Sequence, residues 1–260
     1  MWLRPHNRIL GTRSVLRRFP KTSVEKIELH RPDRRFDAYL CLSTDNVNAG
    51  EYQINSFLSR AEQEYYAALK FQRRQFSYLI GRYCAKHALC AYLDETDATR
   101  FSIHAGVFNQ PIVRHPARGN VQISISHSDE WGAALAFPED HPMGIDIEVV
   151  KPEKNNVLQT QLTVDEQILA QVLPHPKATQ LTLLWTVKEA LSKTIKSGLM
   201  TPFELFELRQ MQVQEMSVIS TFRHFVQYKA VSFMLKNAVC SIICPGSTAA
   251  QFNIEKLTHA

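Results

Sequence analysis

Hydrophobic and polar positions follow a helical period in two parts of the chain. In residues 59–93, apolar and aromatic side chains return every three or four positions, which predicts one long helix. Ser59 and Glu62, three residues apart, predict a capping box at its start. Gly81 lies inside this segment. Because glycine costs a helix about 1 kcal/mol relative to alanine, we expect Gly81 to allow the close approach of another element.

The second helical pattern covers residues 163–172 and 181–196. Gly198 follows it directly and Pro202 comes shortly afterwards. Both residue types are common just beyond the end of a helix, so we expect the helix to stop near residue 196.

The period changes to two in six short segments bounded by turn residues, which predicts strands. We expect the first three to form an antiparallel meander. Helix followed by strands thus occurs twice, which predicts an α+β fold of two similar halves, residues 1–143 and 144–260, each with a long helix packed on a small antiparallel sheet. The six predicted strands are residues 121–126, 131–137, 143–150, 221–226, 228–235 and 238–244.

Composition narrows the class of protein. With 45% hydrophobic and 21% charged residues, the chain is typical of a folded globular protein. No run approaches the roughly 18 consecutive apolar residues of a membrane-spanning helix, so we expect a soluble protein with no membrane partner. Arginines interrupt the start of the chain, which argues against a secretory signal. The cysteines lack C-x-x-C or zinc-ligand spacing, so we predict reduced and mostly buried thiols in a cytoplasmic protein: Cys41, Cys84, Cys90, Cys240 and Cys244.

The net charge of +5 is concentrated near the N-terminus. Residues 1–35 hold ten Lys and Arg against three acids, a local charge of +7 that leaves −2 for the rest. Such a segment can attract an acidic partner or phosphates, because its field steers anions. A solvated basic surface and a transit peptide are the alternatives.

Two acids alternate with isoleucines in the predicted strand at residues 144–148, G-I-D-I-E. Side chains alternate between the faces of a strand, so Asp146 and Glu148 share one face and the isoleucines the other. Two carboxylates on one face suit Mg²⁺, which prefers oxygen ligands. The alternative is an edge strand with an acidic solvent face.

The second helix holds Trp185, Glu189 and Lys193 at successive intervals of four, so these residues share a face. Taken alone, Glu189 and Lys193 would be an exposed salt bridge, worth only about 0.3–0.5 kcal/mol. A third motif, S-I-S-H-S at residues 124–128, places Ser126 and His127 at a strand end. These side chains can donate to phosphate oxygens, although a lone histidine there is more often an ordinary surface or core residue.

The order of the three motifs carries more information than any one of them. Residues 124–128, 144–148 and 185–193 (W-T-V-K-E-A-L-S-K) together resemble the Sfp-type 4'-phosphopantetheinyl transferases. Residues 73–82 (R-R-Q-F-S-Y-L-I-G-R) resemble a helix of the siderophore-type members. The resemblance covers residues 57–254 and leaves the N-terminal part unmatched.

Two departures from the family pattern concern the cofactor contacts. Where the family usually has G-K-P, this chain has Asn109, Gln110 and Pro111, which removes a lysine expected near phosphates. Where the family often has G-x-G-L after the lysine helix, this chain has lysine at position 196.

The resemblance implies a fold and a reaction. The fold is a pseudo-dimer of two α+β halves, with coenzyme A bound in the cleft between them. The reaction transfers the 4'-phosphopantetheine group of coenzyme A to a serine of an apo acyl or peptidyl carrier protein, giving the holo carrier and 3',5'-ADP. We therefore expect a monomeric enzyme whose partners are coenzyme A and an acidic carrier protein.

The resemblance also implies a metal site. Asp146, Glu148 and Glu189 would hold Mg²⁺, with Mn²⁺ as an alternative ion. Glu189 would in addition be the general base for the carrier serine, and Lys193 would neutralise charge on the departing 3',5'-ADP. Asp146 and Glu148 thus have the role that their shared strand face already suggested.

Phosphate contacts are implied on the other side of the cofactor. Ser126 and His127 resemble residues that contact the 3'-phosphate. Arg74 and Arg82 are further phosphate contacts by the same resemblance, and bidentate arginine suits phosphate oxygens.

Two other functions fit parts of the sequence. A metal-dependent hydrolase could use the same acids to cleave the coenzyme A pyrophosphate with water in place of serine. A nucleic-acid-binding module is suggested only by the basic N-terminal segment. The basic residues lack interleaved aromatics and match no nucleic-acid motif, so we expect no nucleic acid partner.

Overall fold

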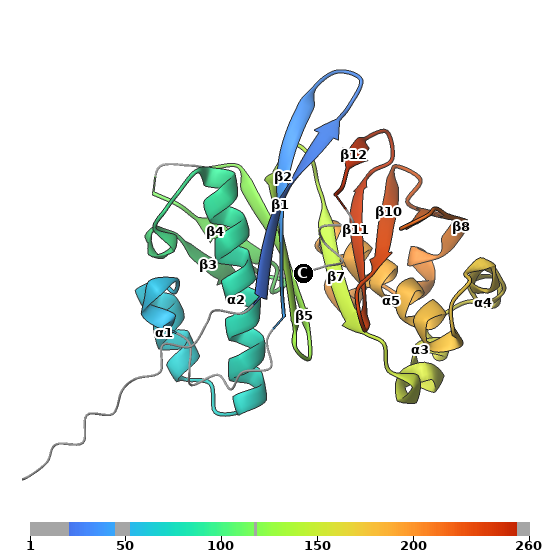
Figure 1. Ribbon diagram of the computed structural model, residues 1–260, viewed down its shortest axis with the longest axis horizontal. Coiled ribbons are helices and arrows are strands. Elements are labelled where there is room, and N and C mark those ends of the chain that lie inside the picture. Colours follow the sequence, from blue (N-terminus) through green and yellow to red (C-terminus); the bar gives the residue numbers. More distant parts are fainter. Residues whose placement is uncertain (1–20, 45–52, 117–118, 254–260) are drawn as a thin grey trace, which may run out of the picture.

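The computed structural model of the protein describes residues 21–44, 53–116 and 119–253 (Figure 1). Two five-stranded antiparallel sheets dominate it. The first has the order β12-β1-β2-β6-β5, from Ala249–Gln251, Lys21–His30, Arg35–Thr44, Trp131–Pro138 and Val121–Ser128. The second has the order β7-β11-β10-β9-β8, from Gly144–Val149, Ala238–Pro245, Tyr228–Met234, Val218–Phe222 and Leu208–Val213. Strands β3 (Ser102–Ala105) and β4 (Pro111–Arg114) form a two-stranded sheet.

One long helix covers the outer face of each large sheet (Figure 1). Helix α2 (Gln72–Leu93) packs on the first sheet and α5 (Lys177–Thr194) on the second. The shorter helices are α1 (Arg60–Ala67), α3 (Asn155–Thr160) and α4 (Val164–Leu169). Single 3-10 turns lie at Ile54–Ser56, Ala98–Arg100, Pro152–Lys154, Ala170–Val172, Gly198–Met200 and Phe203–Phe206.

The inner faces of the two sheets pack on each other. Leu40 and Leu135 of the first sheet lie in the same apolar cluster as Ile145, Ile147 and Ile242 of the second. The molecule is therefore built in four layers, helix, sheet, sheet and helix. This arrangement confirms the predicted α+β class.

The two halves share a strand order. In the first half β6 lies between β2 and β5, and in the second half β11 lies between β7 and β10. In both halves the chain runs from β2 or β7 through the helices and then into the other two strands of these three. Strand β12 nevertheless pairs with β1, so the C-terminal part of the chain returns to the first sheet. The predicted division at residues 143 and 144 stays a prediction.

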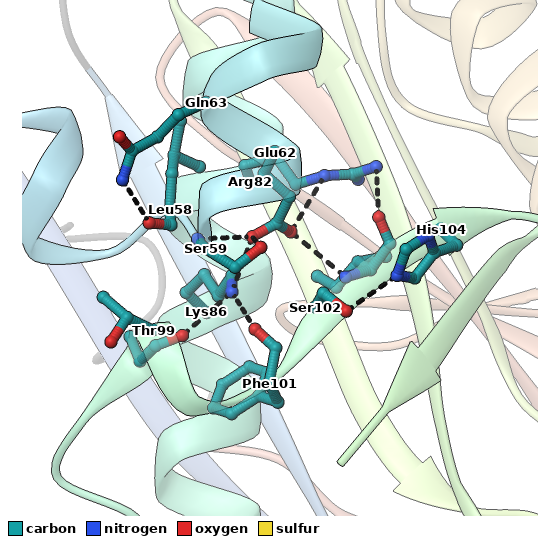
Figure 2. A network of polar contacts seen from close by, with 12 residues as sticks. Leu58, Ser59, Glu62, Gln63, Arg82, Lys86, Thr99, Phe101, Ser102 and His104 are labelled. Carbon is teal, nitrogen blue, oxygen red and sulfur yellow. Dashed lines mark hydrogen bonds and ion pairs between the residues drawn. The ribbon is translucent and has the colours of Figure 1, made fainter. Parts of the chain in front are cut away.

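A buried ion pair secures the long helix of the first half (Figure 2). Glu62 of α1 closes the predicted capping box by accepting the N–H of Ser59 at 2.9 Å. The same carboxylate contacts the ammonium of Lys86 of α2 at 2.8 Å and accepts the N–H of Ile103 of β3 at 3.1 Å. Lys86 also donates to the carbonyl of Phe101. One carboxylate thus joins two helices and a strand.

The second half repeats this arrangement. Glu166 of α4 accepts the N–H of Thr163 at 2.9 Å, contacts Lys188 of α5 at 2.7 Å and accepts the N–H of Leu208 of β8 at 3.1 Å. Both lysines are fully buried. A lysine is rarely buried without a partner, so each pair fixes the rotation of its long helix over the sheet. The repeat supports the interpretation of two similar halves.

The single helix predicted over residues 59–93 is wrong, because the chain breaks between α1 and α2. The capping residue Phe71 of α2 is extended, and the side-chain amide of Gln75 donates to the carbonyl of Leu69 at 2.8 Å. The break turns α1 back along α2, which lets Glu62 reach Lys86. The sequence has no glycine or proline at the break, and the helical spacing of apolar residues continues across it, so the pattern predicted one helix instead of two.

The predicted meander is also wrong in its last strand. Strands β5 and β6 pair antiparallel as expected, but β7 pairs with β11, about a hundred residues away. Local pattern cannot reveal such distant pairing. The strand predicted at residues 221–226 is β9, Val218–Phe222, and the chain turns after it because Arg223 bonds back to Glu207. Strands β1 to β4, β8 and β12 were not predicted.

The thiol prediction agrees with the structure, since all five cysteines are free and only Cys90 is not buried. None of the helices that the structure describes combines the length and the apolar character needed to cross a bilayer.

Gly144 sets how closely α5 approaches β7. A Cβ at this position would collide with the hydroxyl of Thr194 and the carbonyl of Ala190, both in α5. We predict that Gly144→Ala lowers the free energy of unfolding by about 1–3 kcal/mol, as overpacking does. Denaturant unfolding measures this change. Gly119→Ala is the control, since a Cβ there meets nothing within 4 Å, and equal stability of the two variants would contradict the prediction.

Candidate functional site

The centre of the candidate site is an ion pair between β7 and α5. Asp146 of β7 is only 4% exposed, and its Oδ1 lies 2.8 Å from Nζ of Lys193. Lys193 also donates to the carbonyl of Ile125 in β5 at 3.3 Å. Among the described residues, the ion pair of Lys193 is with Asp146 and not with Glu189, its neighbour one turn earlier. The lysine therefore links the second half to the first.

Glu148 lies two residues further along β7 and is half-buried. Its Oε2 accepts a hydrogen bond from Oγ of Ser128 at 2.9 Å and lies 3.4 Å from Nζ of Lys154. Burial, and next the negative charge of Asp146, raise the pKa of Glu148 above its usual range. Asp146 and Glu148 are thus close enough for the charge of one to affect the pKa of the other.

Glu189 extends the acidic group from α5. Burial, and next the charge of Asp146, raise the pKa of Glu189 to about 7, while Lys193 opposes the shift and Glu148 adds to it. A carboxylate with this pKa is a good proton acceptor near neutral pH. The structure therefore brings Asp146, Glu148, Glu189 and Lys193 together from two elements.

The donor set suits a hard divalent cation. Oδ2 of Asp146 is buried and has no hydrogen-bond partner. The three carboxylates repel one another, and Lys193 and Lys154 together carry one charge fewer than they do. Within residues 21–44, 53–116 and 119–253, no three His, Cys, Asp or Glu side chains are already arranged around a metal position. The unsatisfied oxygen and the excess charge fit Mg²⁺, which keeps several ligands other than protein.

Ser126 and His127 lie on opposite faces of β5. Ser126 is buried and donates from Oγ to Oδ1 of Asp146 at 2.7 Å. His127 is exposed on a concave surface; partial loss of hydration, and next the charge of Lys193, lower its pKa. A Cβ on Gly81 would lie 3.2 Å from Ile125 and 3.7 Å from the His127 ring, so this glycine allows α2 to approach β5 closely, as the sequence predicted.

The two predicted arginines differ in position. Arg74, in the first turn of α2, is exposed and lines a cavity with His127. Arg82 instead donates to the carbonyl of Ile103 at 3.2 Å and lies 3.6 Å from Glu62 (Figure 2). Arg82 lines neither cavity beside the acids, so the structure does not bring it together with the other site residues.

Two cavities flank the acids. One, of about 250 Å³, is bounded by β5, the loop before β4 and the end of α5, and Glu189 and Lys193 line it. The other, of about 560 Å³, lies by the start of α2 and contains Glu148. Its lining includes both acids and bases, and Lys151 and Lys154 pair with the acids Asp129 and Glu148. The side chains that suit an anionic ligand are Arg73, Arg74 and His127, for which no acidic partner is found among the described residues.

Both departures from the family pattern line the smaller cavity. Gln110 and Lys196 lie on its walls, and Nζ of Lys196 donates to Oε1 of Gln122 at 3.0 Å. Lys196 has a φ of 58°, which is uncommon for a residue with a side chain. This chain thus has glutamine where the family pattern has a lysine, and it has a lysine at position 196 in the wall of the same cavity.

Sequence reasoning missed Ser128 and Lys154, which both bond Glu148. The period-two serines of β5, at positions 124, 126 and 128, were the available signal.

Comparison with known proteins concerns the second half of the chain. Residues 142–243 match the model of the 4'-phosphopantetheinyl transferase superfamily, so the match covers less than half of the chain. The matched residues include Asp146, Glu148, Glu189 and Lys193, so the acidic group belongs to the part of the chain that the family model covers.

Parts of this chain are similar to known proteins. The 4'-phosphopantetheinyl transferase gsp of Aneurinibacillus migulanus is 30% identical over 96 residues, 36% of this chain and 40% of the relative. The chain thus matches less than half the length of this curated relative. A crystal structure of a holo-(acyl-carrier-protein) synthase from Bacillus anthracis str. Ames in complex with CoA (3',5'-ADP) is 17% identical, with a TM-score of 0.32, and the match covers 44% of this chain and 96% of that one.

The raised pKa of Glu189 predicts a specific pH dependence of stability. The folded protein binds this proton more tightly than the unfolded chain, whose glutamate titrates near 4.5. The stability contribution is therefore present below pH 4.5 and is lost as the pH rises through about 7. We predict that Glu189→Gln becomes more stable relative to wild type across this range. Urea unfolding in EDTA from pH 4.5 to 8 measures it, and a pH-independent difference would contradict it.

Proposed function

We propose that this protein transfers the 4'-phosphopantetheine group of coenzyme A to a serine of an apo acyl or peptidyl carrier protein. The observation that carries the proposal is the group formed by Asp146, Glu148, Glu189 and Lys193 inside the matched superfamily domain. The name of the gsp relative supports it. The products are the holo carrier and 3',5'-ADP.

Asp146, Glu148 and Glu189 would hold Mg²⁺, which supplies positive charge to the pyrophosphate of coenzyme A. The chain supplies the remaining groups. Ser126 and Lys193 restrict one oxygen of Asp146 and leave Oδ2 free for a ligand. Ser128 and Lys154 orient Glu148 in a similar way.

Glu189 and Lys193 have the two chemical roles in transfer. The serine oxygen attacks the phosphorus that bears the pantetheine arm, and the bond from that phosphorus to the bridging oxygen breaks. Glu189 accepts the serine proton. Lys193 stabilises the negative charge that develops on the departing 3',5'-ADP.

The larger cavity is the proposed phosphate-binding region. His127 and Arg74 line it together with Arg73, Lys151 and Lys154. Arginine and lysine side chains bind phosphate oxygens strongly because both partners of the hydrogen bond are charged. Ser126, which was expected to contact the 3'-phosphate, would act there through Asp146 instead.

We propose that the carrier protein is acidic. We also propose that the enzyme is a monomer and is located in the cytoplasm. The basic segment at residues 1–35 was expected to attract the carrier, and its first twenty residues lie outside the described part of the chain. The pathway that the carrier serves is tested by a panel of carriers from fatty acid, polyketide and nonribosomal peptide synthesis.

Intact-mass measurement of apo carriers incubated with coenzyme A tests this function. We predict one added phosphopantetheine per carrier in Mg²⁺ or Mn²⁺, and none in excess EDTA, because the carboxylates need a hard cation to bind the pyrophosphate. Transfer that is unchanged in EDTA would contradict the metal assignment. Release of free phosphopantetheine without any modified carrier would instead support the hydrolase.

Single-turnover transfer by Glu189→Gln separates its two roles. The variant keeps the shape of the side chain but removes its charge and basicity. We predict that transfer falls by at least about 10²-fold while coenzyme A affinity, measured by calorimetry, changes much less. Glu64→Gln on the exposed α1 is the control and should transfer like wild type. Transfer by Glu189→Gln within a few-fold of wild type would rule out Glu189 as the base.

A further inference from the structure

Three serines of β5 join the two sheets at the site. β5 and β7 are each the end strand of their own sheet. The N–H groups of Ile145, Ile147 and Val149 in β7 donate to Oγ of Ser124, Ser126 and Ser128, at 3.1, 3.3 and 3.1 Å. All three serines are buried, with 5, 6 and 8% of their surface exposed. Serine side chains thus take the place that backbone carbonyls have in an ordinary sheet.

Two of these serines, Ser126 and Ser128, make a second hydrogen bond, to a carboxylate. A serine hydroxyl has one proton to donate in addition to its acceptor lone pairs. With a lone pair occupied by a backbone N–H, Ser126 donates its proton to Oδ1 of Asp146 at 2.7 Å, and Ser128 donates to Oε2 of Glu148 at 2.9 Å.

Within the part of the chain that the structure describes, Ser124 makes no such second contact, and the sequence gives the reason. The carboxylate bound by each serine belongs to the residue just before the N–H that the serine accepts. For Ser124 that residue is Gly144, which has no side chain. Ser124 therefore contributes to the junction of the two strands without touching an acid.

We propose that Ser126 and Ser128 are positioning residues, which orient the carboxylates of Asp146 and Glu148 toward the cation while they lock β5 against β7. This inference rests on the proposed function for its cation. It assigns Ser126 an action through Asp146 rather than a direct contact with coenzyme A. It also makes the acid geometry depend on the junction between the halves, since the serines come from one sheet and the acids from the other.

The test compares Ser126→Ala and Ser128→Ala with Ser124→Ala. Each variant loses one N–H···Oγ contact between the same two strands, worth about 1 kcal/mol. Ser126→Ala and Ser128→Ala lose in addition the hydrogen bond to a carboxylate, so their stability should fall further than that of Ser124→Ala. Mn²⁺ binding to the protein alone, measured by electron paramagnetic resonance, reports on the carboxylates. We predict about 10–100-fold weaker binding for Ser126→Ala and Ser128→Ala, and binding within about twofold of wild type for Ser124→Ala, because only the first two remove a partner of a ligating carboxylate.

The outcomes separate this inference from the proposed function. Equal Mn²⁺ affinities for the three variants would overturn it even if wild type modifies the carrier, since a purely structural role affects all three alike. Absence of Mn²⁺ binding by wild type would overturn it as well. Weaker binding by Ser126→Ala and Ser128→Ala alone would support it, even if no carrier were modified and the transferase proposal failed.

Discussion

The ion pair between Asp146 and Lys193 lies where three parts of the molecule meet: the end strand of each sheet and the long helix of the second half. Lys193 can span this distance because Gly144 leaves room for α5 against β7. The same lysine bonds the carbonyl of Ile125 in the first half. The position of the acids is thus a property of the junction, and neither half contains all the groups that define it.

Around this pair, the protein gathers three carboxylates whose charge Lys193 and Lys154 neutralise only in part. Glu148 and Glu189 both have raised pKa values, from burial and from repulsion by Asp146, which means that their ionised forms are held at a cost. The buried pairs Glu62–Lys86 and Glu166–Lys188 are the contrast, since each carboxylate there has a lysine and backbone donors. The three acids, only partly compensated by lysines, are therefore the place to expect a ligand of opposite charge.

Much of this arrangement could be predicted from local pattern, and the rest depends on long-range contacts. Alternation along β7 correctly assigned Ile145 and Ile147 to the core and the two acids to the other face. Helical spacing placed Glu189 and Lys193 on one face of α5. Sequence gave no sign that Lys193 crosses to Asp146, because that contact spans 47 residues and depends on how α5 sits on the sheet.

The errors have the same origin. The break between α1 and α2 allows Glu62 to contact Lys86. No glycine or proline at the break indicates it in the sequence. The phosphate contact expected of Arg82 from its motif stays a prediction, and in the structure its guanidinium lies by Glu62 and Ile103. Ser126 and Ser128 were visible as a period-two pattern, but their partners belong to another sheet.

A double-mutant cycle on Asp146→Asn and Lys193→Gln tests most directly whether this ion pair organises the junction. The free energy of unfolding of wild type, both single variants and the double variant would be measured in EDTA. The two residues are in direct contact and largely shielded from water, so the account predicts a coupling free energy of about 1–3 kcal/mol, with the double variant more stable than the sum of the single losses implies. Additivity within about 0.3–0.5 kcal/mol would contradict it, because the two side chains would then act independently.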